Sequence, residues 1–199
     1  PWVVLGALFD LWQRGGRQGF ADRLRRILRL PRADWGKAVA HSGLGITIFA
    51  VAAVLGWSSE DIRVVQLGES FEHRGYTITL TDVARTQGPN YIATTGQVDI
   101  TRDGVFVAHL TPEKRIYPAA GMPTTEAAID YSLTRDLYLA LGDPQDGGGW
   151  ALRTYVKPFA NWLWLGAIIM ALGGFLSLTD RRYRIAVGAK RAAAAVPAE

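Results

Sequence analysis

The sequence predicts a polytopic α-helical membrane protein fragment with an inserted all-β domain, either a small barrel or a sandwich, outside the membrane. Residues 38–57 and 159–178 are each 20 residues long and contain no Asp, Glu, Lys or Arg. A helix of that length rises about 30 Å, the hydrocarbon thickness of a bilayer. The 100 residues at 58–157 instead form short runs in which apolar and polar side chains alternate, as in β-strands.

The first residues, 1–13, read as the end of a truncated transmembrane helix. They begin with Pro1 and include an apolar run that is too short to span a bilayer. No basic region with a small-residue cleavage site precedes this run, so it does not resemble a signal peptide. We therefore expect the chain to be the C-terminal piece of a larger membrane protein.

Residues 14–37 form a basic loop with eight Lys or Arg against Asp22 and Asp34. Within it, Leu24, Ile27 and Leu28 recur at helical spacing among arginines, and Pro31 follows. This pattern predicts an amphipathic helix that lies at the membrane interface and anchors the topology.

The distribution of charge predicts the orientation of the chain. The basic loop and the basic tail at 179–199 together carry thirteen Lys or Arg, whereas residues 57–157 carry 9 basic and 13 acidic residues. By the positive-inside rule both flanks are cytoplasmic, and residues 58–157 lie on the opposite side. The basic residues flank the spans, so the high isoelectric point does not indicate nucleic-acid binding.

The β domain shows its strands by alternation and its turns by composition. Tyr76, Ile78 and Leu80 alternate with threonines, and Trp150–Val156 reads as a final strand before Pro158. Turn signals separate the runs at His73-Arg74-Gly75, Gly88-Pro89-Asn90, Arg102-Asp103-Gly104 and Gly142-Asp143-Pro144. This spacing predicts six or more strands. Thr124–Ser132 could instead be a short helix capped by Thr124 or Thr125.

His41 is the candidate functional residue, because an ionisable side chain inside an apolar span is costly and normally faces a cavity, a cofactor or another helix. Ala38 and Gly45 lie on the same helical face as His41. Their small size would let a flat, bulky group such as haem approach an imidazole ligand. The alternatives are an interhelical hydrogen bond, with Gly43 and Gly45 serving packing, or a proton relay.

The other candidate residues do not suggest catalysis. His73 and His109 have no second ligand at a metal-like spacing, which predicts surface roles for both. Pro112-Glu113-Lys114-Arg115 with Tyr117 reads as a solvated loop or a docking surface. The chain has no Cys, which excludes disulfides and thiolate chemistry within it.

Several motifs resemble the C-terminal third of the CcmF/NrfE-type cytochrome c haem lyases, and the resemblance extends over nearly the whole chain. The motifs are Ala40-His41-x-Gly43, Gly88-Pro89-Asn90-Tyr91, Glu113-Lys114-Arg115-x-Tyr117, Thr125-Glu126-Ala127-Ala128-Ile129, Thr134-Arg135-Asp136-Leu137-Tyr138-x-Ala140-Leu141-Gly142, Lys157-Pro158-Phe159, Trp162-x-Trp164-x-Gly166, Met170-Ala171-Leu172-Gly173-Gly174 and Asp180-x-Arg182-Tyr183-Arg184. One departure is Asn161, where the family often has a basic residue.

The resemblance implies a bacterial inner-membrane protein, with residues 58–157 in the periplasm, that acts in cytochrome c maturation. Its partners would be a haem chaperone, apocytochrome c and the thiol-reducing and apocytochrome-presenting subunits. Haem would be transferred to the Cys-x-x-Cys-His motif of the apocytochrome. His41 matches one of two axial ligands of a b-type haem.

The second axial ligand and the substrate-haem site would lie outside this fragment, so no catalytic residue is expected within it. The alternative is a membrane transporter or scaffolding subunit with a periplasmic β domain, in which His41 serves helix packing.

Overall fold

The computed structural model describes residues 2–16, 19–119 and 121–180 and divides into two compact units. One unit runs to Ala52 and resumes at Trp162, and it is helical. The other unit is Ala53–Asn161 and contains all the described strands. The predicted basic tail falls almost wholly outside the described residues.

The first unit is built from apolar and amphipathic helices. They are α1 (Trp2–Arg14), α2 (Phe20–Leu28), α3 (Arg32–Trp57) and α4 (Trp162–Leu178). Helix α3 begins at Arg32, before the predicted start at residue 38, and so includes the end of the predicted basic loop. Its first turn carries Asp34, and the Asp180 side chain accepts a hydrogen bond from the Ala33 amide at 3.0 Å. Negative groups at this end stabilise the helix N-terminus.

Among the described residues, α3 is the one helix whose length and composition suffice to cross a membrane. Helix α4 contains no charged residue but has only 17 residues. It begins later than predicted because strand β10 extends to Pro158 and Phe159 adopts a turn conformation, with φ at 56°.

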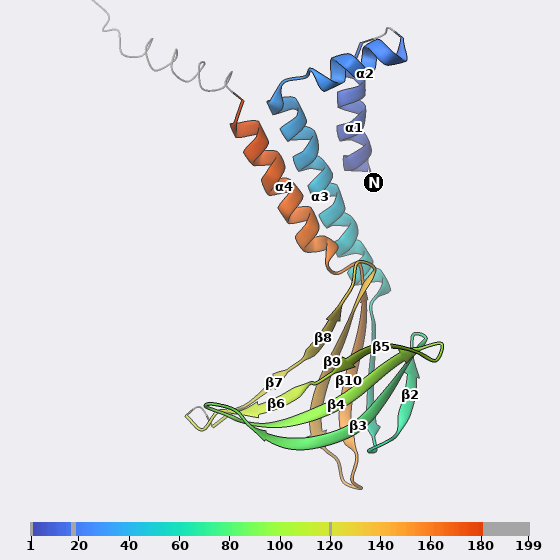
Figure 1. Cartoon of the computed structure of the whole chain (residues 1–199), viewed down its shortest axis with the longest axis vertical. Helices are drawn as coiled ribbons and strands as arrows, with labels where there is room; N and C mark the ends of the chain where they lie inside the picture. Colours follow the sequence, from blue (N-terminus) through green and yellow to red (C-terminus); the bar gives the residue numbers. More distant parts are fainter. Residues whose placement is uncertain (1, 17–18, 120, 181–199) are drawn as a thin grey trace, which may run out of the picture. The chain divides into compact units, whose positions relative to one another are not determined.

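Helices α3 and α4 run side by side (Figure 1) and approach closely through glycines. A Cβ atom added at Gly43 would lie 2.6 Å from both the Gly166 carbonyl oxygen and the Met170 amide nitrogen. A Cβ atom at Gly173 would lie 2.7 Å from the Gly36 carbonyl oxygen. These glycines therefore allow the two backbones to touch, which is the usual packing mode of membrane helices.

The second unit is an antiparallel β-sandwich (Figure 1). Sheet I has the order β1-β10-β9-β8, and sheet II has the order β2-β3-β4-β6-β7 with β5 also paired to β4. The strands are β1 (Ser59–Val65), β2 (Ser70–His73), β3 (Tyr76–Gln87), β4 (Ile92–Arg102), β5 (Val105–Leu110), β6 (Glu113–Ile116), β7 (Pro123–Glu126), β8 (Ala128–Tyr131), β9 (Arg135–Pro144) and β10 (Trp150–Pro158). Of the two predicted forms, the sandwich is correct.

The core of the sandwich lies between the two sheets and follows the predicted alternation. Ile78 and Leu80 on β3 face Leu139 and Leu141 on β9 in one buried cluster. Thr77 and Thr79, between the core positions of β3, are less buried. The period of two along each strand therefore separates the core face from the outer face.

Two predicted turns are tight hairpin turns. Arg74 and Gly75 have φ angles of 54° and 78°, and they join β2 to β3. Asp103 and Gly104, with φ angles of 51° and 76°, join β4 to β5. Positive φ at both central residues matches the twist of the flanking strands, which is why an X-Gly pair is favoured there.

Three local expectations are wrong. Gly142-Asp143-Pro144, which was expected to be a turn, is the end of strand β9. The proposed helix at Thr124–Ser132 is instead strands β7 and β8, which pair with β6 and β9. Backbone pairing at the sheet edges here outweighs the tendency of Thr124 and Thr125 to cap a helix. Pro123 is tolerated because β7 is the last strand of its sheet. The expected loop around Glu113 and Arg115 is strand β6, where Arg115 stacks 4.4 Å from the Tyr91 ring centre.

Candidate functional site

His41 lies in the third turn of α3, and a hydrogen bond within its own helix sets its orientation. The Nδ1 atom of His41 is 2.8 Å from the Lys37 carbonyl oxygen, one turn earlier. A carbonyl oxygen can only accept, so Nδ1 carries the proton in this bond. In the neutral imidazole with this tautomer, the other ring nitrogen, Nε2, has a lone pair that can bind a metal.

A cavity of about 340 Å³ lies between α1 and α3, and His41 forms part of its wall. Small side chains, Gly6, Ala7 and Ala38, line much of it together with Val3. Asp10 and Lys37 supply its charged part. The cavity therefore combines an imidazole, an apolar wall and one ion pair.

Gly43 and Gly45 serve helix packing, as the packing alternative predicts for these two residues. Gly43 contacts α4, and a Cβ atom at Gly45 would collide with the Val4 side chain of α1. The space over Gly45 is therefore filled by α1, whereas Ala38 lines the cavity at His41. Within the described part of the chain, His41 makes no hydrogen bond to another helix.

The charged part of the cavity belongs to a chain of ion pairs between α1 and α3. Asp10 Oδ2 lies 3.4 Å from Lys37 Nζ and 3.2 Å from Arg14 Nε. Arg14 Nη1 in turn lies 2.7 Å from Asp34 Oδ1. Lys37 has one carboxylate partner among the described residues, whereas Arg14 has two.

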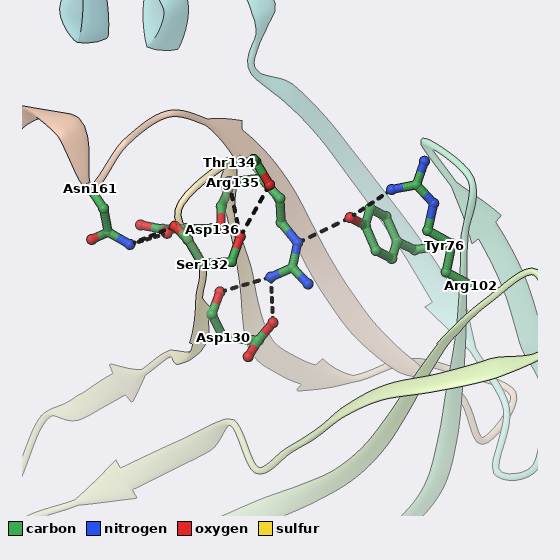
Figure 2. Close-up of polar contacts among 8 residues, drawn as sticks. All are labelled: Tyr76, Arg102, Asp130, Ser132, Thr134, Arg135, Asp136 and Asn161. Carbon is green, nitrogen blue, oxygen red and sulfur yellow. Dashed lines mark hydrogen bonds and ion pairs between the residues drawn. The ribbon is translucent and has the colours of Figure 1, made fainter. Parts of the chain in front are cut away.

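A polar cluster in the sandwich joins the two sheets (Figure 2). Arg135 on β9 donates from Nε to the Tyr76 hydroxyl on β3 at 3.0 Å, and its Nη1 pairs with Asp130. Arg102 donates to the same hydroxyl at 3.3 Å. Burial by itself would lower the pKa of Arg135, but the hydrogen bonds to Asp130 and Tyr76 raise it above its usual value.

The same cluster holds the segment that leads into α4. Asn161 Nδ2 donates to Asp136 Oδ1 at 2.8 Å and to the Ser132 carbonyl oxygen at 3.0 Å. Asp136 is 8% exposed, and burial raises its pKa. Asn161 thus makes a neutral amide contact to a buried carboxyl group.

The expected surface role of His73 is wrong, because the side chain is 8% exposed. The Thr154 hydroxyl donates to the Asp61 carbonyl oxygen, so the His73 Nδ1 atom, 3.1 Å away, donates to that hydroxyl. Nε2 then accepts from the Ser59 hydroxyl at 2.8 Å. Period-two reasoning could have found this, since His73 ends β2 on the same face as buried Phe71.

The expected surface role of His109 agrees with the structure, in which its side chain is 46% exposed. Its Nδ1 atom lies 2.6 Å from Asp99 Oδ1, and Nε2 lies 2.8 Å from Gln97 Oε1. Across residues 2–16, 19–119 and 121–180 no cluster of three or more His, Cys, Asp or Glu side chains could hold a metal ion.

The fold defines a class of protein in which an antiparallel β-sandwich is inserted between apolar helices. The family described as the CcmF C-terminal β-sandwich matches residues 56–158, which is the second unit almost to its ends. The chain belongs to this family, the CcmF proteins of cytochrome c-type biogenesis.

Individual relatives extend the similarity to the helices. The chain is 58% identical to the cytochrome c-type biogenesis protein ccl1 of Rhodobacter capsulatus over 98% of this chain and 29% of that protein. It is 44% identical to CcmF of Haemophilus influenzae over 95% of this chain and 29% of that protein. The chain therefore spans under a third of the length of these relatives.

A solved structure named cytochrome c heme lyase CcmF has the same fold. It matches with a TM-score of 0.60 and 22% identity over 89% of this chain and 33% of that chain. The helices and the sandwich are thus both represented in a larger protein of known structure.

Proposed function

We propose that this chain is the C-terminal portion of a cytochrome c haem lyase subunit. The subunit helps to transfer haem from a periplasmic haem chaperone to the Cys-x-x-Cys-His motif of apocytochrome c, together with the maturation subunits that reduce and present the apocytochrome. Family membership and the names of the relatives support this role. The thiols of the reaction would belong to the substrate, since this chain has no Cys.

The membrane arrangement is part of the proposal. Helices α3 and α4 cross the bacterial inner membrane, the sandwich lies in the periplasm, and the basic flanks remain in the cytoplasm. The absence of charged side chains in residues 38–57 and 159–178 and the excess of Lys and Arg in the flanks support this orientation. The glycine contacts between α3 and α4 fit two helices that pack within lipid.

His41 is proposed as one axial ligand of a b-type haem, with the second ligand on a helix outside this fragment. The observation that carries the proposal is the hydrogen bond from Nδ1 to the Lys37 carbonyl oxygen, which leaves Nε2 available to bind iron. The wall of Gly6, Ala7 and Ala38 suits an apolar macrocycle. When bound, the haem would supply one-electron redox chemistry.

The test uses the full-length protein in a strain that lacks its own copy. His41→Ala should lose most of the co-purifying b-type haem and reduce the yield of mature cytochrome c at least about tenfold, because the loss of a residue that only orients a metal ligand typically costs that much. Membrane insertion should persist, because Ala makes the span more apolar.

Ser42→Ala, a neutral change at the next residue of the same helix, should keep both haem and maturation at the level of the unchanged protein. If His41→Ala retained normal haem and normal maturation, ligation would be refuted, and a packing role in a scaffolding subunit would remain.

A further inference from the structure

The ligand role proposed for His41 does not account for the charged part of the α1–α3 cavity. Lys37 and His41 are one turn apart on α3, and both line the cavity. A lysine one helical turn from an axial ligand can reach the edge of the haem that this ligand binds. Haem carries two propionate carboxylates at one edge, and its remaining surface is largely apolar.

We propose that Lys37 binds a haem propionate and thereby positions the haem against His41, an inference that rests on the proposed function. In this arrangement the Lys37 ammonium exchanges its Asp10 partner for the propionate. Its pairing with Asp10 is loose, at 3.4 Å, and the side chains are 55% and 41% exposed. An exposed ion pair of this kind is worth little, so its exchange is cheap.

Asp10 does not lose all its partners in the exchange. Arg14 lies 3.2 Å from the same Asp10 oxygen and is also held by Asp34 at 2.7 Å. Among the described residues, Arg14 is thus paired with two carboxylates, whereas Lys37 is paired with one. Lys37 is therefore the cation of this network that can accept a further carboxylate.

The distribution of charged and apolar residues in the cavity fits a haem bound with its propionates toward Lys37. Asp10 and Lys37 form its charged part, and Val3, Gly6, Ala7 and Ala38 form its apolar part. A haem ligated by His41 would leave its apolar surface against the small side chains and direct its propionates toward Lys37. The reverse orientation would bury carboxylates against apolar residues, which is costly.

The experiment compares two variants that break the same ion pair from opposite sides, in the full-length protein. Lys37→Met removes the cation and should weaken haem binding about tenfold, because losing a hydrogen bond to a charged group changes a binding constant by about that much or more. It should also lower the reduction potential of the haem, because a nearby positive charge favours the ferrous state. Asp10→Asn frees Lys37 and should maintain or strengthen haem binding and raise the potential. Lys37→Arg should resemble the unchanged protein.

A modified haem tests the propionate directly. When the apoprotein is reconstituted with haem dimethyl ester, which lacks free carboxylates, Lys37→Met and the unchanged protein should bind it equally well. If Lys37 only holds α1 against α3, Lys37→Met and Asp10→Asn will weaken binding alike, and the ester will not remove the difference. That result would overturn the role of Lys37 while leaving His41 as ligand. Absence of haem from the unchanged protein, or its retention in His41→Ala, would overturn the proposed function itself.

Discussion

The imidazole of His73 lies between the hydroxyl groups of Ser59 and Thr154, which belong to two strands of the opposite sheet. Burial lowers the pKa of His73, and the cations Arg74 and Arg63 add to this effect against the opposing influence of Asp61. The folded state therefore holds this histidine neutral. Protonation would place a charge between the sheets and would remove the acceptor of the Ser59 hydroxyl.

The stability of the sandwich should consequently depend on pH through His73. The unfolded chain has a histidine pKa of about 6.5, so below that pH it binds more protons than the folded chain. Stability contributed by neutral His73 is complete above this value and is lost as the pH falls toward the lower pKa of the folded state.

His73→Phe tests this at the level of the residue. It should cost about 1–3 kcal/mol of unfolding free energy at pH 8, because two hydroxyl groups lose a partner, and it should flatten the loss of stability between pH 7 and pH 5. Denaturant unfolding of residues 53–161 would measure both. His109→Gln, at the exposed histidine, should keep the pH-dependent loss. A His73→Phe profile as steep as that of the unchanged domain would contradict the account.

The sequence predicted His41 as a candidate residue, but it did not predict the pairing of Lys37 with Asp10 or the burial of His73. His41 was identifiable because an imidazole is rare within an apolar span. The pairing of Lys37 with Asp10 was not identifiable, since it depends on which faces of α1 and α3 meet. His73 was misjudged because its neighbours in sequence are polar, although its position on β2 faces the core.

At the scale of elements, strands with clear alternation and hairpins with an X-Gly pair were predicted correctly. Strands β7 and β8 were not, because edge pairing decides their conformation and the local sequence does not. The extra turns of α3 before residue 38 were missed because charged residues there were read as a loop. Apolar composition identifies a span more reliably than it identifies helix ends.

Two adjacent glycines on α4 provide a test of the packing between helices. A Cβ atom at Gly173 would collide with the backbone of α3, whereas one at Gly174 has no neighbour within 4 Å. Gly173→Leu should therefore separate α3 from α4 and destabilise the full-length protein by about 1–3 kcal/mol, as overpacking usually does. Gly174→Leu should have little effect.

Samples of each purified full-length variant would be heated to a series of temperatures. Size-exclusion chromatography of the heated samples would give the midpoint of thermal unfolding for each variant. A midpoint lowered by several degrees for Gly173→Leu alone is the expected result. Equal midpoints for the two variants would show that α3 and α4 do not approach as described.

At the scale of the whole molecule, the chain combines a helical unit that contains the candidate haem ligand with a sandwich that has its own core. The composition of the two units predicted this division, because residues 38–57 and 159–178 lack charge while 58–157 alternate. The second axial ligand that we propose could not be located, since the chain spans 29% of the length of these two relatives. The central claim is therefore that His41 supplies one of two axial bonds.

Chemical rescue tests this claim most directly. We expect the unchanged full-length protein to show the sharp α and β absorption bands of reduced, six-coordinate b-type haem. Full-length His41→Gly should lose these bands, because one axial nitrogen is gone. Free imidazole, added during purification, should enter the vacated space and restore those bands, whereas Ser42→Gly should show them with or without imidazole. Unchanged bands in His41→Gly without any added imidazole would contradict ligation by His41.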